Sequence, residues 1–291
     1  MIDHDEQGDR AAWTVAVIRD FMGQSPANSL QNESGEPAWG EPLIGFSSGH
    51  DPLYRKLKED IGDFYWTPPE IFAETFHSVP RDLMVISWIL PQTEPTKKDN
   101  RKEKNYPSER WSRSRNFGEQ ANVALARHVV EKLLQSGFRA FVPTLSPLWK
   151  WQTSERYGFA SNWSERHAAF AAGLGTFSLC DGLITPKGKA MRCGSVIADI
   201  PISPTPRPYE DHRAYCLFHA KGICKKCIDR CPVGALSEAG HDKLKCRNFL
   251  FDVVAGYAKA RFGFESYGCG LCQTGVPCES GIPDSGAPDH P

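Results

Sequence analysis

The sequence lacks a long apolar run, an excess of charge of either sign, and a leader-like N-terminus. No stretch approaches the roughly 18 consecutive apolar residues of a membrane-spanning helix. Lys+Arg 34 against Asp+Glu 35 leaves a formal net charge of −1, which argues against binding to nucleic acid or membrane surfaces through general charge. The first ten residues are acidic and polar, without a basic segment or a twin-arginine pair. We therefore expect a cytoplasmic chain with no membrane partner and no nucleic-acid partner.

Cysteine, by contrast, is abundant. The 291 residues include ten cysteines, and eight of them lie between Cys216 and Cys278. A chain in a reducing compartment keeps its thiols reduced, so this density indicates metal binding or catalysis more than a disulfide framework. The two others, Cys180 and Cys193, are expected to be small, buried, apolar residues.

Periodicity and breaker residues predict a mixed fold with one sheet. We expect a short helix near residues 11–22, followed by irregular connections that wrap the domain, and a solvated polar loop over 93–117. Helices are predicted over 119–136, ended by Gly137, and over 162–172, where Asn162 and Glu165 form a capping box. The strands are predicted over 83–90, 138–143 and 194–202. The fold class that follows is α/β or α+β.

Composition divides the chain into four parts. Residues 1–80 form an N-terminal wrapping region, residues 81–203 an α+β core, and residues 204–280 the cysteine-rich domain, which begins at a proline-rich connector. Residues 281–291 are expected to form a flexible tail.

The eight clustered cysteines form two groups of four, each with a central C-x2-C. The first group includes Cys224-Lys-Lys-Cys227-Ile-Asp-Arg-Cys231-Pro, which matches the end of the bacterial ferredoxin run, whose fourth cysteine binds the other cluster. Crossed ligation of two [4Fe–4S] clusters follows from that pattern. The predicted first set is Cys216, Cys224, Cys227 and Cys278, and the predicted second set is Cys231, Cys246, Cys269 and Cys272.

Two features leave alternatives open. The ferredoxin run places its first cysteine where this chain has Lys221, so Cys216 must reach in from an enlarged loop, or that cluster has another fourth ligand. A single zinc site of four thiolates, formed by Cys224, Cys227, Cys269 and Cys272, is the other metal interpretation. It leaves the remaining four clustered cysteines without a role.

Several motifs, in this order, resemble those of reductive dehalogenases and epoxyqueuosine reductases. They are Ala172-Gly-Leu-Gly175, Gly182-Leu-Ile-Thr-Pro186, Gly188-x-x-x-Arg192 and Val196-x-x-Asp199-x-Pro201, followed by the cluster motifs around Cys227 and Cys269. The similarity covers residues 80–280. It implies an α+β architecture with a nitroreductase-like α/β corrinoid-binding domain followed by a ferredoxin-like domain with two [4Fe–4S] clusters.

The resemblance implies a reductase in which electrons pass from an external ferredoxin or flavodoxin through two clusters to a base-off cobalamin, which reduces a small organic substrate. The residues expected to bind the corrinoid are Gly173, Gly175, Gly182, Leu183, Ile184, Thr185 and Pro186. Arg192 is expected to be the catalytic cation that lowers the pKa of a tyrosine acid, for which Tyr157 is the candidate. The alternative for the aromatic stretch around Tyr157 is ordinary core packing. For His167, the alternative to an acid is a structural role.

The sequence also departs from these families. Phe159 stands near the position of the aspartate that epoxyqueuosine reductases place before the A-G-L-G helix, and the chain has no room after Cys278 for their tRNA-holding region. A tRNA substrate is therefore not expected. Two other functions remain open: a non-catalytic iron–sulfur electron-transfer protein, and a corrinoid reductase or trafficking protein.

Overall fold

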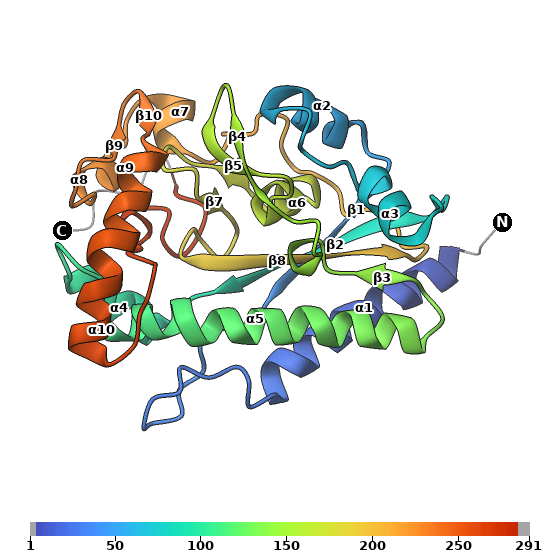
Figure 1. Cartoon of the computed structure of the whole chain (residues 1–291), viewed down its shortest axis with the longest axis horizontal. Coiled ribbons are helices and arrows are strands. Elements are labelled where there is room, and N and C mark those ends of the chain that lie inside the picture. The colour runs from blue at the N-terminus through green and yellow to red at the C-terminus, as the bar shows by residue number, and fades with distance from the viewer. Residues whose placement is uncertain (1–3, 285–291) are drawn as a thin grey trace.

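The computed structural model describes residues 4–284, and its centre is a four-stranded antiparallel sheet (Figure 1). The strand order is β1-β2-β8-β3, with β1 at Leu43–Ser48, β2 at Leu83–Pro91, β3 at Ala140–Phe141 and β8 at Met191–Asp199. The two central strands pair along their whole length, from Leu83 opposite Asp199 to Pro91 opposite Met191. All nine residues of β2 are buried, because helices cover both faces of the sheet.

The helices form one layer on each side of the sheet. Helices α1 (His4–Gln24) and α5 (Glu109–Gln135) lie on one face, where they bury Ile18 and Leu125 against β2. Helices α2 (Pro52–Ile61), α3 (Pro68–Phe76) and α6 (Glu165–Ala171) lie on the other face. The hairpin of β4 (Trp151–Ser154) and β5 (Gly158–Ser161) extends above α6.

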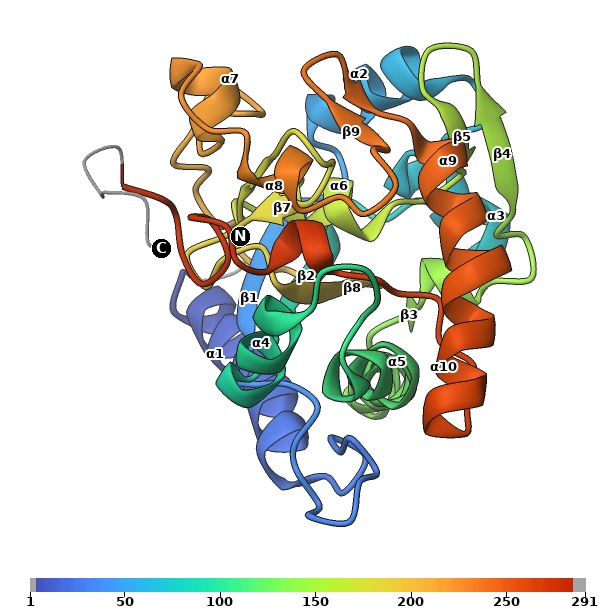
Figure 2. The ribbon, with the colours of Figure 1, turned by 90° about the vertical axis from the view of Figure 1, so that its left-hand side faces the viewer.

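The cysteine-rich segment gathers at one end of the sheet, beside α4 (Glu94–Lys102), as Figure 2 shows. It consists of short elements: α7 (Leu217–Lys221), α8 (Lys226–Asp229), β9 (Leu236–Ser237), β10 (Gly240–His241), α9 (Lys243–Asn248), the π-helical turn Phe249–Val254, α10 (Ala255–Phe262) and the 3-10 turn Leu271–Gln273. A 3-10 turn at Pro143–Leu145 and the strands β6 (Thr176–Phe177) and β7 (Leu183–Ile184) complete the fold.

Mixed α and β structure is confirmed, and so are the central strand and the end of the long helix at Gly137, which adopts φ 85°. The expectation of irregular structure after residue 22 is wrong, because β1, α2 and α3 lie there. Strand β1 pairs with β2, so residues 1–80 share a sheet with residues 81–203. The expected flexible tail lies outside the described residues from position 285 on.

The expected solvated loop over 93–117 is also wrong, because it forms α4 and the first turns of α5. Ser108 caps α5 through its Oγ, which accepts from the Trp111 amide at 3.3 Å. Ion pairs between Glu109 and Arg113 stabilise the exposed side of that turn. Apart from Trp111, the buried side of α4 and of the first turns of α5 consists of small polar residues, so no apolar period is visible there: Thr96, Asn100, Ser112 and Ser114.

Helix α6 begins at Glu165 rather than at Asn162, with Ser164 as its N-cap. The expected capping box is therefore absent, and Asn162 instead bonds to the backbone of Leu148 and Lys150. Strand β8 begins three residues before the predicted position and β3 is shorter than predicted.

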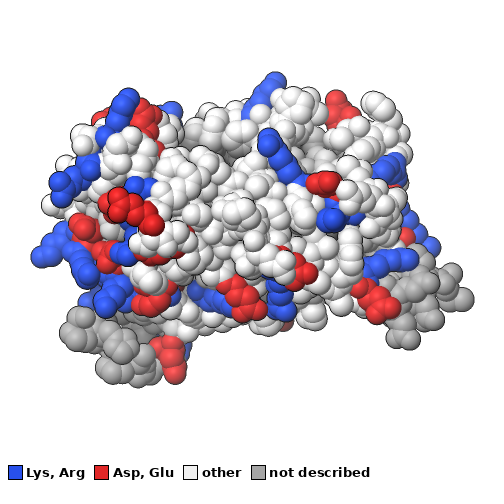
Figure 3. Space-filling model, turned by 90° about the horizontal axis from the view of Figure 1, so that it is seen from below, with Lys and Arg blue, Asp and Glu red and all other residues white. Residues whose placement is uncertain are grey.

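Surface charge is mixed. On the face seen in Figure 3, basic and acidic side chains are interspersed and leave a wide uncharged area between them. None of the described helices is long and apolar enough to cross a membrane.

Candidate functional site

Four cysteines line one small cavity. Cys216 precedes α7, Cys227 lies on α8, and Cys224 and Cys278 come from the loops beside them. These are the four residues of the predicted first set. Leu179, Ile184 and Val276 supply apolar walls, so thiols from two distant parts of the chain converge in a largely apolar environment.

The second set gathers around Cys269. The thiolate charges of Cys231 and Cys246 raise the pKa of Cys269, and the charge of Cys269 raises the pKa of Cys272. Backbone amides already point at two of the sulfurs: Ala235 N–H donates to Cys231 Sγ at 3.2 Å, and Leu271 N–H donates to Cys269. Burial raises the pKa of Cys269 to about 12, a cost that a bound metal removes by stabilising the thiolate.

The described residues contain no preformed site for a single metal ion. Tetrahedral thiolates on one zinc lie about 3.8 Å apart, since each Zn–S bond is about 2.3 Å. Within residues 4–284, no group of three or more His, Cys, Asp or Glu side chains is close enough to hold one metal ion. The zinc and the [4Fe–4S] interpretations therefore both stay predictions.

Cys193 is buried away from these sets, and burial raises the pKa of its thiol to about 12, in line with an apolar structural role. Cys180 is different. It is buried too, but its thiol contacts Cys227, from the first set, and Cys272, from the second. Lys189 Nζ donates to Cys180 Sγ at 3.3 Å. The expectation of a purely apolar Cys180 is therefore wrong.

The residues expected to contact a corrinoid are mostly covered by the chain itself. Leu183, Ile184 and Thr185 have no exposed surface, while Pro186 is exposed. A Cβ on Gly175 would meet the Ile184 carbonyl oxygen at 2.2 Å. Gly173 packs against the Pro206 carbonyl and Gly182 against the Lys189 stem in the same way, so these glycines permit close packing within the protein.

Arg192 lies elsewhere, beside a cavity of 480 Å³ between α5 and residues 266–267. Its guanidinium pairs with Glu119, which lines the cavity together with Arg115, Arg127 and Tyr267. The neighbouring charge of Arg192, together with burial, lowers the pKa of Arg115 to about 10. Burial opposes ionisation of Glu119, but the two arginines outweigh it and lower its pKa. Arg115 and Arg192 carry two positive charges beside the single negative charge of Glu119, which leaves a net positive charge at this side of the cavity.

Tyr157 is not brought to Arg192. It lies at the tip of the β4–β5 hairpin, where its hydroxyl donates to Asp60 Oδ2 at 2.5 Å and its ring stacks under Lys243. Burial and the Asp60 carboxylate raise the pKa of Tyr157 to about 12. That direction is opposite to the one expected of an activated acid.

Two residues near the cavity carry chemistry that the sequence patterns did not single out. Tyr267 lines the cavity two residues before Cys269. Burial raises the pKa of Glu165 to about 7, although the positive charge of Arg192 opposes this rise. Buried Glu165 Oε2 has no hydrogen-bond partner, and neither does buried Ser87 Oγ. Only the tyrosine's place beside a cluster motif could have indicated it in advance.

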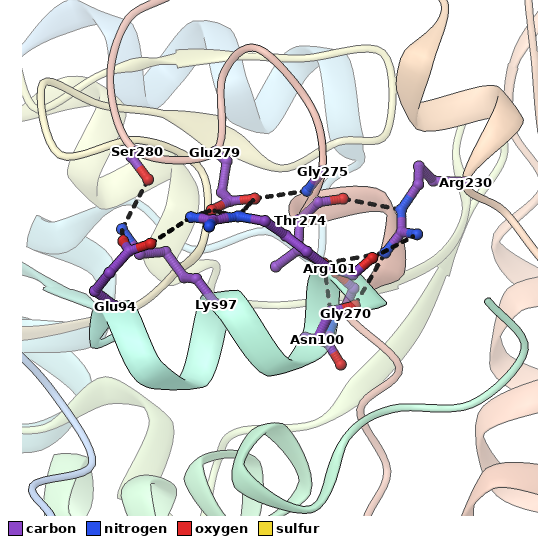
Figure 4. A network of polar contacts seen from close by, with 10 residues as sticks. All are labelled: Glu94, Lys97, Asn100, Arg101, Arg230, Gly270, Thr274, Gly275, Glu279 and Ser280. Carbon is purple, nitrogen blue, oxygen red and sulfur yellow. Dashed lines mark hydrogen bonds and ion pairs between the residues drawn. The ribbon is translucent and has the colours of Figure 1, made fainter. Parts of the chain in front are cut away.

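The second cysteine loop is fixed to α4 by a polar network (Figure 4). Arg230 donates to the carbonyl oxygens of Asn100 and Glu103 at the end of α4, and to those of Leu271 and Thr274 in the loop. Arg101 pairs through its Nε with Glu279 at 2.7 Å, directly after Cys278. The loops that carry the thiols are thus connected to the core by charged hydrogen bonds.

The fold and site define an α+β protein with two thiol sets at the end of its sheet, and comparisons with known proteins agree with the resemblance found in the motifs. The chain is 35% identical to the epoxyqueuosine reductase of Bacillus anthracis over 125 residues, which are 41% of this chain and 30% of that protein. The similarity confirms the resemblance. The matched region spans less than a third of that relative's length. No family model matches the chain.

Solved structures show weaker likeness. A crystal structure of epoxyqueuosine reductase with a tRNA stem loop matches with TM-score 0.42 and 20% identity, covering 85% of this chain and 64% of that chain. The catabolic reductive dehalogenase NpRdhA, in complex with 3-bromo-4-hydroxybenzoic acid, matches with TM-score 0.44 and 18% identity. The match covers 69% of this chain and 26% of that chain. Nothing in these comparisons supports the expected absence of a nucleic-acid partner.

Proposed function

We propose that this chain is a reductase that carries two [4Fe–4S] clusters and delivers electrons from an external donor to a small organic substrate. One observation supports it above the others. The loop that carries Cys269 also contributes Ser266 and Tyr267 to the wall of the 480 Å³ cavity. A cluster held by the second set therefore adjoins a space whose volume is typical of small-ligand sites. When bound, the clusters supply electrons one at a time.

The cavity's own side chains suit an anionic or strongly polar substrate. Arg115 and Arg192 share Glu119, and the positive excess attracts negative groups. Reduction by two electrons also consumes protons. Burial raises the pKa of Glu165 to about 7, toward the range in which a general acid works best. We assign it as the candidate proton donor in place of Tyr157.

We also propose that a corrinoid is held at this cavity rather than at residues 182–186. The support is that buried Glu165 Oε2, within electrostatic reach of Arg192 and Glu119, has no hydrogen-bond partner. The amide groups around a corrin ring can satisfy such an atom. A corrinoid supplies strongly reducing chemistry at its cobalt. Arg192 and Glu119 are the residues expected to hold it and to orient the substrate.

The cluster proposal is tested by anaerobic reconstitution. We expect about eight irons per chain, with broad visible absorbance. Replacing Cys224 or Cys278 by Ser should remove about four irons, whereas Cys193→Ser, a buried thiol outside both sets, should remove none. Stoichiometric zinc, or equal iron loss from all three variants, would refute the assignment of the clusters.

Cobalamin titration of the cluster-loaded protein tests the corrinoid. We expect saturable binding that weakens at least tenfold in Arg192→Ala with the iron content unchanged. No saturable binding by the wild-type protein would eliminate the corrinoid and leave the electron-transfer protein as the better interpretation. Oxidation and reduction of free cobalamin as a substrate would instead favour the corrinoid reductase.

A further inference from the structure

Lys189 is a lysine whose charge has almost no access to water. Its residue is 1% exposed, and its ammonium group donates to Cys180 Sγ at 3.3 Å and to the Cys278 thiol. The charges of Cys227 and Cys272 also act on it. Lys189 therefore faces thiols of both cluster sets at once.

The position of Lys189 is fixed by the backbone as well as by the side chain. Its amide donates to the Cys278 carbonyl at 2.8 Å and to the Glu279 carbonyl at 3.1 Å. The preceding Gly188 adopts φ 84°, and a Cβ there would meet the Glu279 oxygen at 2.0 Å. The lysine stem packs over Gly182, where a Cβ would lie 3.0 Å from Lys189 Cγ and Cδ. These contacts hold the backbone of Lys189 directly against the segment that carries Cys278.

A buried ammonium is costly unless negative groups surround it. Four thiolates around a [4Fe–4S] core carry a net negative charge, and that charge grows when the cluster is reduced. The reduction potential of such clusters depends on nearby charge, on hydrogen bonds to the sulfurs and on solvent exposure. Lys189 acts on the first two of these and, being buried, is screened little by water.

We propose that Lys189 is a positioning residue that raises the reduction potential of the clusters, with Cys180 orienting its ammonium group. This rests on the proposed function, because it requires that the clusters bind. Cys180 is then a hydrogen-bond acceptor for Lys189 and not a ninth cluster ligand. The cation makes transfer of an electron onto the cluster easier by stabilising the reduced, more negative state.

The experiment is a redox titration of the reconstituted protein, followed by electron paramagnetic resonance. Iron content is measured first, since a wild-type chain without iron fails the proposed function and not this inference. Lys189→Met removes the charge with little change of volume, and Lys189→Gln removes it while keeping a donor for Cys180. Lys189→Arg keeps the charge. Lys187→Met is the matched control, because Lys187 is two residues away and pairs with exposed Glu41.

We expect the neutral variants to hold about eight irons and to have midpoint potentials more negative by at least 59 mV, a tenfold change in a one-electron equilibrium. Lys189→Arg and Lys187→Met should stay near the wild-type potential. Cys180→Ser should keep the iron. Unchanged potentials in the neutral variants would overturn the inference. So would loss of iron from both of them, which would assign Lys189 to assembly, or loss of iron from Cys180→Ser, which would make Cys180 a ligand.

Discussion

Single residues hold the first thiol set together, and Gly188 is one of them. It adopts φ 84° and lies directly against the backbone of Glu279, which follows Cys278. Only a residue without a side chain allows this approach. Cys278 thus reaches its cavity because the turn before Lys189 contains glycine.

Gly188→Ala is expected to destabilise the protein by more than about 3 kcal/mol, because it adds left-handed strain to a clash with backbone. Gly137→Ala is the control. Gly137 adopts φ 85°, but nothing lies within 4 Å of its Cβ position, so only the strain of about 1 kcal/mol applies. Urea denaturation of the two variants measures the difference. Equal losses would show that the contact with Glu279 is unimportant.

At this scale, spacing predicted part of the site and missed the rest. The short C-x2-C intervals place Cys224 near Cys227, and the ferredoxin pattern adds Cys278. Cys180 and Lys189 have no such pattern, since they meet the thiols through the hairpin between β6 and β7 and the turn after it. The raised pKa of Glu165 was not predictable, because it comes from burial of the first residue of α6, a helix that starts later than the sequence suggests.

Among the elements, α4 is the one that connects the core to the cysteine-rich segment. The guanidinium of Arg230 donates hydrogen bonds to carbonyl oxygens at the end of α4 and in the loop after Cys269. A lysine has one compact ammonium group and cannot span the same set of acceptors. The planar fork of arginine therefore fixes the distance between helix and loop.

Arg230→Lys is expected to loosen the second thiol set. After anaerobic reconstitution, the variant should lose about four irons on gel filtration in the presence of a chelator, while the first set keeps its own. Arg261→Lys, on the exposed side of α10, is the matched control and should lose none. Full iron retention by Arg230→Lys would mean that the cluster alone fixes the loop.

Element boundaries were predictable where apolar residues recur, as in β2 and in the second half of α5. They were not where polar residues are buried. Asn100 has no exposed surface because its side chain bonds to Thr274 and to the Ser108 amide. Such a residue looks solvent-facing in sequence. Strand β1 was missed for a related reason, since Gly45 and two serines interrupt its apolar pattern.

In the whole molecule, the predicted boundary at residue 204 is crossed by many contacts. Thr205 exchanges two hydrogen bonds with Phe46 of β1, and Glu279 pairs with Arg101 of α4. Leu179 and Ile184 are buried against Cys227 and Cys278. The cysteine-rich segment and the core therefore complete one another's interiors.

A chain cut after residue 203 is expected to lose its cooperative unfolding transition, because it exposes Leu179, Ile184 and the edge of β1. Binding of a hydrophobic dye and thermal unfolding followed by circular dichroism measure this. A chain ending at residue 284 is the control and should match the full chain. A cooperative transition in the shorter chain would show that residues 1–203 fold independently.

The first cavity draws its walls from Ser178 to Lys189 and its thiols from Cys216 to Cys278. During synthesis at the ribosome, the central sheet is therefore complete long before the last of these thiols emerges. A cluster inserted earlier would lack a ligand and would be open to water and oxygen. If the first set holds a cluster, as proposed, its insertion has to follow translation of Cys278, the last of the four thiols.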